Sequence, residues 1–272
     1  MSDLFVIVYA TLLGAVVGSF LNVCVHRWPL DQSVVSPRSR CPRCGNPIRG
    51  YDNIPIVSWL LLRGRCRSCG EPISWRYPFV ELVVALVWGG SMLAFAPGPV
   101  DLYIGGTTSY GLAQIGEAVR VALFLTILLG IALTDLDHYI IPDEFSLGGL
   151  VLGIALSFLP GGITPGASIF GAFVGFGVLW LIALLGEAAF KKPAMGGGDI
   201  KMMAMIGAFI AWPGVLLTIF LGSLLGSVIF GPISWRTGKL VPFGIFLAMG
   251  AAVTAIWGDA IIAWYAREII GL

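Results

Sequence analysis

The sequence predicts an all-α polytopic membrane protein with about eight transmembrane helices and one extramembrane insert. Hydrophobic residues make up 57% of the 272 residues and charged residues only 11%, whereas soluble domains average about 45–50% and about 25%. The mean hydropathy is +0.92. The apolar runs are continuous rather than alternating, which argues against a transmembrane barrel. This composition excludes a soluble globular enzyme and, because large apolar residues are abundant, a disordered chain.

Apolar runs of nearly membrane-spanning length define the expected helices. They cover residues 4–25, 79–96, 118–134, 145–159, 167–186, 200–211, 214–230 and 244–266. The first run follows Asp3 and no basic residue, and it lacks a small-residue cleavage site, so we interpret it as a retained span rather than a signal peptide. Residues 160–166 and 212–213 are expected turns. We expect no internal repeat.

Residues 26–78 differ in kind from the rest of the chain. They hold nine arginines and only three acidic residues, with many Pro and Gly residues. Threading the chain eight times with this insert inside also places three later segments inside: residues 134–144, 187–199 and 231–243. Fourteen of the sixteen basic residues then lie on one side, all but Arg120 and Arg267. This positive-inside pattern predicts a cytoplasmic insert and both termini outside.

Four of the five cysteines lie in the insert as two C-x-x-C pairs, Cys41 with Cys44 and Cys66 with Cys69. Two such pairs can place four thiolates around one tetrahedral zinc ion, and a four-thiolate shell is closed and structural. Disulfides or a redox pair are the alternatives, which a reducing cytoplasm disfavours. The predicted insert is therefore a cytoplasmic zinc knuckle, whereas Cys24 is expected to be a buried apolar residue of the first span.

Two aspartates occupy positions where a charge near a membrane span is costly. Asp135 ends a purely apolar span, and Asp199 follows three glycines and opens the next helix. The predicted topology places both carboxylates at the same depth on the inner face. Two such carboxylates can share a proton, one acting as general base on a water molecule and the other as general acid. The alternative is that Asp199 only caps a helix and Asp135 only anchors a span end.

Several distinct motifs follow one another along nearly the whole chain. They are the Gly-Ser-Phe-Leu-Asn-Val segment at residues 18–23 with His26 and Arg27, the two C-x-x-C pairs, the segments at residues 53–55 and 58–60, the segment from Asp135 to Asp143, and the G-x-G-D match at residues 196–199. Together they resemble the prepilin leader peptidase/N-methyltransferase family, which are bifunctional GxGD-type intramembrane aspartyl proteases of type IV pilus and type II secretion systems.

The resemblance implies cleavage of the basic leader of type IV prepilins or pseudopilins at the cytoplasmic face of the bacterial inner membrane. It implies N-methylation of the new N-terminus with S-adenosylmethionine, for which no residues can be named. Asp135 and Asp199 would be the catalytic pair, with Asp137 and Asp143 in supporting positions and Lys201 neutralising local charge. Expected partners are the prepilin or pseudopilin substrate and membrane lipid, with no nucleic acid.

The expected organisation is a first transmembrane helix at residues 1–25, the tetracysteine insert at residues 26–78 and a peptidase core at residues 79–272. The inner face is strongly basic, so recognition of a basic leader must use local acids, for which Asp137 and Asp143 are candidates together with Glu144.

Three other functions compete with the predicted one. An intramembrane protease of the presenilin type would lack the tetracysteine insert, a transporter would place its aspartates near the midplane, and a methylase without peptidase activity would not need both aspartates.

Overall fold

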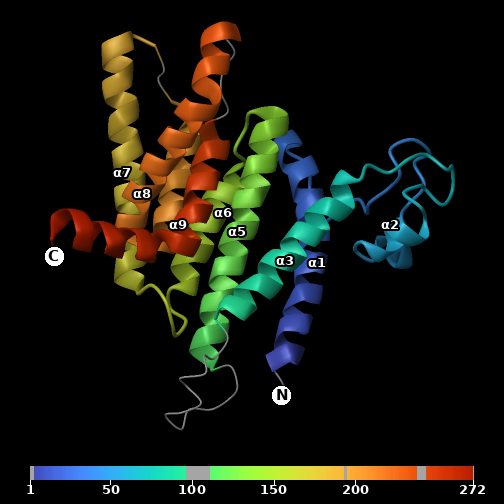
Figure 1. The fold of residues 1–272 in the computed structure, drawn as a ribbon. Coiled ribbons are helices and arrows are strands. Elements are labelled where there is room, and N and C mark those ends of the chain that lie inside the picture. Colours follow the sequence, from blue (N-terminus) through green and yellow to red (C-terminus); the bar gives the residue numbers. More distant parts are fainter. Residues whose placement is uncertain (1–2, 96–110, 193–194, 238–242, 272) are drawn as a thin grey trace. The chain divides into compact units, whose positions relative to one another are not determined.

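The computed structural model describes residues 3–95, 111–192, 195–237 and 243–271. The chain divides into two compact units, Met1–Ala122 and Leu123–Leu272. The helices shown in Figure 1 are α1 (Asp3–Arg27), η1 (Trp28–Leu30), η2 (Gly50–Asn53), α2 (Val57–Leu61), α3 (Arg76–Ala94), α5 (Leu112–His138), α6 (Asp143–Leu156), α7 (Pro165–Phe190), α8 (Gly197–Thr237), α9 (Phe243–Tyr265) and η3 (Ala266–Ile270). Lys239, expected in an inner loop, lies outside the described residues.

The all-helical membrane class is confirmed in the described part of the chain. Six helices are long and apolar enough to cross a membrane: Leu4–Leu30, Arg76–Ala94, Leu112–His138, Pro165–Phe190, Gly197–Ile229 and Phe243–Ile270. The two remaining apolar runs appear in different forms. The run at residues 145–159 overlaps the 14-residue helix α6 (Asp143–Leu156). The runs at residues 200–211 and 214–230 lie in α8, divided by its kink at Ala211.

The turn expected at Trp212 and Pro213 appears as a kink at the preceding residue, within the segment labelled α8. Ala211 has φ 57° and ψ 177°, which is far from helical geometry. Pro213 has no amide hydrogen and its ring crowds the preceding turn, so a helix cannot pass through it unchanged. The chain therefore leaves helical geometry at Ala211 and changes direction there, so α8 consists of two helices joined across a kink.

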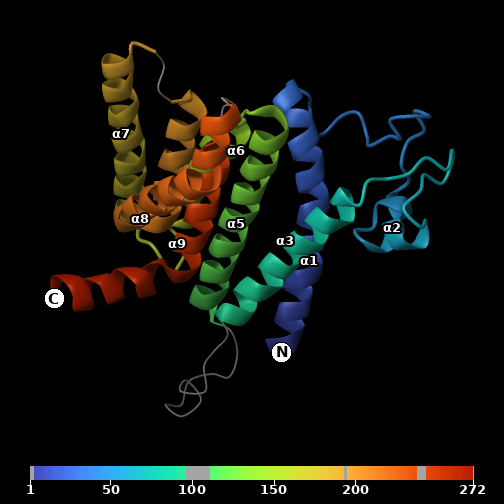
Figure 2. The same cartoon turned by 45° about the horizontal axis from the view of Figure 1, so that its top comes forward.

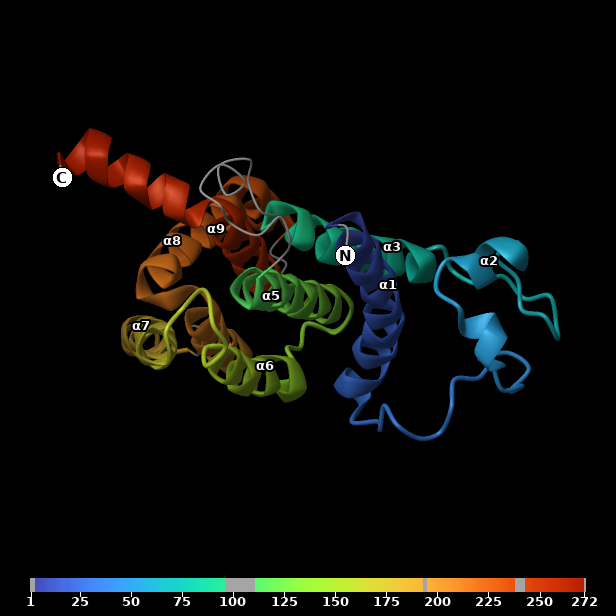
Figure 3. The ribbon, with the colours of Figure 1, turned by 90° about the horizontal axis from the view of Figure 1, so that it is seen from below.

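In the first unit, α1 and α3 pack against each other through glycines (Figure 3). A Cβ added at Gly18 would lie 2.8 Å from the Cα of Glu81, and one added at Gly14 would lie 2.7 Å from the Cβ of Trp88. Small residues allow this close approach, which provides dispersion contacts in a membrane where helix association gains little from the hydrophobic effect. Cys24 is buried in α1, as expected.

The insert lies beside this helix pair and is joined to it by a buried carboxylate. Glu81 of α3 accepts a hydrogen bond of 2.7 Å from the backbone amide of Ile56, a residue held at φ 62°. The insert's own charges are also partly paired, because Arg67 binds Asp52 through two nitrogens and Arg43 lies 3.3 Å from Glu71. These contacts order a segment that has only short helices of its own.

In the second unit, α8 contacts α6, α7 and α9 (Figure 2). Its first stretch carries the buried core residues Met202, Met203, Met205, Ile206 and Phe209. Gly207 and Gly171 let the backbones of α8 and α7 touch, since a Cβ added at Gly207 would lie 2.0 Å from the carbonyl oxygen of Gly171. The start of α8, which carries Asp199, is thus anchored by a buried stretch of the same helix.

Candidate active site

Asp135 lies in the last turn of α5 and is 6% exposed. Its neighbour Thr134 is fully buried, and its hydroxyl donates to the carbonyl oxygens of Gly130 and Ile131. This buried hydroxyl is therefore hydrogen-bonded within its own helix. The helix ends at once because Tyr139 adopts φ 56°. The chain then returns toward α6, and the side chain of Asp135 remains within the unit rather than in solvent.

The carboxylate of Asp135 is held by the beginning of α9. The amide of Ile245 donates to Oδ2 of Asp135 at 3.1 Å, across 110 residues of sequence. Gly244 makes this approach possible, because an added Cβ would lie 2.8 Å from the same Oδ2. The amides at a helix start favour an anion, so α9 both positions the carboxylate and stabilises its charge. This partner of Asp135 was not predicted from the sequence, in which Gly244 at the start of an expected span was the available signal.

Asp199 lies in the first turn of α8, directly after the glycine run. A Cβ added at Gly198 would lie 3.1 Å from the Cβ of Ile141, and the Cδ1 of Ile141 would lie 3.0 Å from a Cβ added at Gly244. Ile141 therefore packs against both glycines, one beside each aspartate. The glycines are required for close packing around Ile141.

Ile141 packs against the glycine beside each predicted aspartate, so the end of α5 that carries Asp135 and the start of α8 that carries Asp199 lie close together. Asp135 is buried and Asp199 is half-buried. Two negative charges at one poorly hydrated place are unfavourable. The pair can hold one proton between its two members, so it offers a base and an acid at the same site.

An ion pair flanks the aspartates. Lys201 Nζ lies 2.7 and 2.9 Å from the two carboxylate oxygens of Asp143, at the starts of α8 and α6. Lys201 thus neutralises a neighbouring carboxylate. The other acidic candidates, Asp137 and Glu144, are exposed. Asp143 is already engaged, so it is the least available of the three acids considered for binding a basic leader.

The four insert cysteines form one cluster. Their Sγ atoms all lie within 4.8 Å of one another, and Cys41 Sγ is 3.8 Å from Cys69 Sγ. Each pair sits on a tight turn, with Gly45 N donating to Cys41 O and Gly70 N donating to Cys66 O, both at 2.9 Å. Four converging sulfur atoms on two such turns are the ligand set of a tetrahedral structural zinc site.

The thiols of this cluster influence one another's protonation. Backbone amides of Cys44 and Arg43 lower the pKa of Cys41 to about 7. The Glu71 amide lowers the pKa of Cys69, but burial and the hydrogen bonds with the other three cysteines outweigh it and raise that pKa to about 12. A metal cation that bound these thiols would displace their protons, as expected of a metal site.

The insert contains a short repeat that the sequence analysis missed. The bridge between Arg40 and Pro47 has a counterpart between Arg65 and Pro72, and Ile73 N donates to Gly64 O as Ile48 N donates to Ser39 O. Each position of the first knuckle thus recurs 25 residues later. The signal was present in the pattern Arg-Cys-x-x-Cys-Gly-x-Pro-Ile, which occurs twice.

Comparison with known proteins covers both units. Residues 12–95 match a family model described as the bacterial peptidase A24 N-terminal domain, and residues 122–231 match one described as the type IV leader peptidase family. Proteins named prepilin leader peptidase/N-methyltransferase align with most of the chain. That of Aeromonas hydrophila is 35% identical over 288 residues, covering 95% of this chain and 93% of the relative.

The chain belongs to the type IV leader peptidase family. A second relative of the same name in this family, from Pseudomonas aeruginosa, is 36% identical over 282 residues, covering 93% of this chain and 91% of the relative. A third, from Myxococcus xanthus, is 40% identical over 235 residues, and the chain spans 65% of its length. No solved structure matches the chain. Membership in this family agrees with the resemblance expected from the sequence.

Proposed function

We propose that this protein cleaves the leader peptide of type IV prepilins or pseudopilins, with Asp135 and Asp199 as the catalytic pair. The observation that carries the proposal is that Ile141 packs against both Gly198 and Gly244, the glycines beside the two aspartates, within one compact unit. Relatives that carry the name prepilin leader peptidase support the choice of substrate. The nearby carboxylates of Asp137 and Glu144 are exposed, so they do not form a similar buried pair.

The pair can hydrolyse a peptide bond without a covalent intermediate. The ionised carboxylate takes a proton from a water molecule, whose oxygen attacks the scissile carbonyl carbon. The protonated carboxyl group gives its proton to the leaving nitrogen, so the C–N bond breaks and the pair again holds one proton. The Ile245 amide and the glycines around Ile141 keep the carboxylates in place during both steps.

The position of the aspartates along their spans fits a substrate cut at the membrane surface. Asp135 is near the end of the span Leu112–His138, and Asp199 is near the beginning of the span Gly197–Ile229. The excess of basic residues on this side supports a cytoplasmic face and the bacterial inner membrane as the location. A prepilin, with a basic leader before an apolar helix, would present its scissile bond at this depth.

We also assign the methylation named in the relatives to this protein, with S-adenosylmethionine as donor. When bound, the donor supplies a methyl group on a sulfonium sulfur. The methyl group would pass to the neutral amine of the new N-terminus, and we assign no residues to holding the donor. We assign the four cysteines as the ligands of a structural zinc ion. We further propose three parts of the chain: the first helix at residues 1–25, the insert at residues 26–78 and the peptidase core at residues 79–272.

Cleavage of a purified prepilin by the reconstituted protein tests the proposal. Asp135→Asn and Asp199→Asn should each abolish cleavage, because an amide can act neither as base nor as acid. Asp259→Asn is the matched control, since Asp259 is an exposed aspartate of α9. Cleavage that survives in either active-site variant would refute the two-aspartate mechanism.

A further inference from the structure

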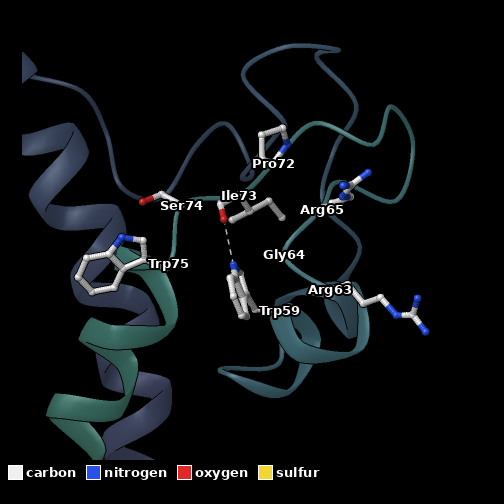
Figure 4. Close-up of a pocket in the computed structure, with 8 residues that line it drawn as sticks. All are labelled: Trp59, Arg63, Gly64, Arg65, Pro72, Ile73, Ser74 and Trp75. Atoms are coloured by element: carbon white, nitrogen blue, oxygen red, sulfur yellow. Dashed lines mark hydrogen bonds between the residues drawn. The ribbon is translucent and has the colours of Figure 1, made fainter.

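The hollow of about 500 Å³ on the second cysteine knuckle does not fit the proposed substrate, which has a basic leader before an apolar helix. Arg63 and Arg65 lie on its lining, as Figure 4 shows, and none of the described residues that line it is acidic. Its charge therefore opposes a basic leader. A better surface for this substrate lies in the second unit, on the short helix α6.

The helix α6 begins beside the two aspartates. Its first residue, Asp143, follows Ile141 by two positions, and Ile141 packs against the glycines next to Asp135 and Asp199. The ion pair between Lys201 and Asp143, at 2.7 Å, joins the first turn of α6 to the first turn of α8. A surface along α6 is therefore continuous with the candidate active site.

The two sides of α6 differ. One side is buried within the unit, since a Cβ added at Gly149 would lie 2.9 Å from Met205 and one added at Gly153 would lie 2.8 Å from Phe209. The opposite side is exposed and consists of Glu144, Leu147, Gly148, Val151 and Ala155. Their spacing places these residues on one side of the helix, which we call the exposed face of α6. Figure 3 shows α6 at the edge of the second unit.

Gly148 is the residue of this face that indicates a partner. A glycine inside a helix destabilises it relative to alanine, and Gly149 and Gly153 are explained by their close packing. No described atom lies within 4 Å of a Cβ added at Gly148, so packing within the described chain does not explain this glycine. Small residues on a membrane helix let the backbone of a second helix approach closely.

The exposed face of α6 is complementary to both parts of the proposed substrate. Glu144 in the first turn of α6 supplies a negative charge at the end near the aspartates. The remainder of the face is apolar or small, with Leu147 41% and Val151 68% exposed. A basic segment would lie near the carboxylate, and the apolar helix that follows it would lie along the rest of the face.

We propose that the exposed face of α6 binds the apolar helix of the prepilin or pseudopilin substrate, an inference that rests on the proposed leader cleavage. The backbone of the substrate helix packs on Gly148, between Leu147 and Val151, and the basic leader lies toward Glu144. This contact positions the bond between leader and helix beside the two aspartates.

Steady-state kinetics of the reconstituted full chain with a purified prepilin tests the proposal. Gly148→Leu fills the face and should raise KM about tenfold, the lower limit for one misfitted apolar contact. The value of kcat should stay nearly unchanged, because the aspartates are untouched. Gly177→Leu is the matched control, since a Cβ added at Gly177 of α7 also meets no described atom within 4 Å, and its KM should equal that of the wild type. Leucine favours a helix more than glycine does, so both variants should fold.

The outcomes separate this proposal from the function on which it rests. A wild-type KM in Gly148→Leu, or an equal rise of KM in Gly177→Leu, would overturn the docking face and leave leader cleavage intact. A loss confined to kcat would also overturn it, because the substitution would then act on the aspartates rather than on substrate binding. A wild type that does not cleave prepilin would refute the proposed function and the docking face with it.

Discussion

The cysteine cluster and the aspartate pair are assembled in opposite ways. Each half of the cluster is a turn closed by its own backbone, as in the bond from Gly45 N to Cys41 O. The aspartates come from α5 and α8, and Asp135 is held by an amide of α9 that is 110 residues away. The first site depends on local turns and the second on the packing of three helices. Damage to each should therefore have different consequences.

The largest effect is expected from loss of the metal at the cysteine cluster. Cys66→Ser should lose the bound zinc and unfold the insert, because structural zinc contributes about 10–16 kcal/mol in small zinc domains. Cys24→Ala, at a cysteine outside the cluster, should keep the metal. Metal analysis and limited proteolysis of the purified variants measure both effects. Full zinc content in Cys66→Ser would contradict the tetrahedral site.

One methyl group added at Gly244 should be enough to impair the aspartate pair. Gly244→Ala places a Cβ 2.8 Å from Asp135 Oδ2, so the carboxylate must shift, and a misplacement of about 1 Å can cost about a hundredfold in rate. The control is Gly177→Ala in α7, where no atom lies within 4 Å of the added Cβ. Rates of prepilin cleavage compare the two variants. Equal rates would show that Gly244 does not control the position of Asp135.

The ion pair beside the aspartates should have a smaller effect. Lys201→Met removes an exposed partner of Asp143, and such pairs contribute about 0–1 kcal/mol, so kcat should fall less than about tenfold. The exchanged variant, Asp143→Lys with Lys201→Asp, should recover much of the loss. Steady-state kinetics with one prepilin measures both. Failure of the exchange to restore any activity would indicate that Lys201 acts other than through this pair.

The smallest effect expected concerns acid stability of the insert. Hydrogen bonds from Arg67 lower the pKa of Asp52. The stabilisation is present above the unfolded pKa of about 3.9 and is lost as the pH falls through the lower folded pKa. The protease resistance of the insert should therefore fall in acid, and less so in Asp52→Asn. The same acid dependence in both proteins would rule out this pair as its source.

The difference between the two sites also explains what could be read from the sequence. The cysteine spacing predicts its cluster because a C-x-x-C turn fixes its geometry within a few residues. Asp135 and Asp199 could be named because charge near a membrane span is rare. The residues that position these aspartates could not be named from the sequence, because contacts such as those of Gly244 and Ile141 depend on how distant helices pack. The turn expected at residues 212–213 is a kink centred on Ala211, because Pro213 indicates an interruption of the helix without fixing its form.

The most direct test of the central claim is whether the two carboxylates act as one unit. Prepilin cleavage is measured for the wild type, Asp135→Asn, Asp199→Asn and the double variant. Members of a unit are not additive, so each single variant should lose at least about a thousandfold in rate and the double variant should lose no more. A single variant with substantial activity, or losses that multiply in the double variant, would contradict a shared catalytic pair.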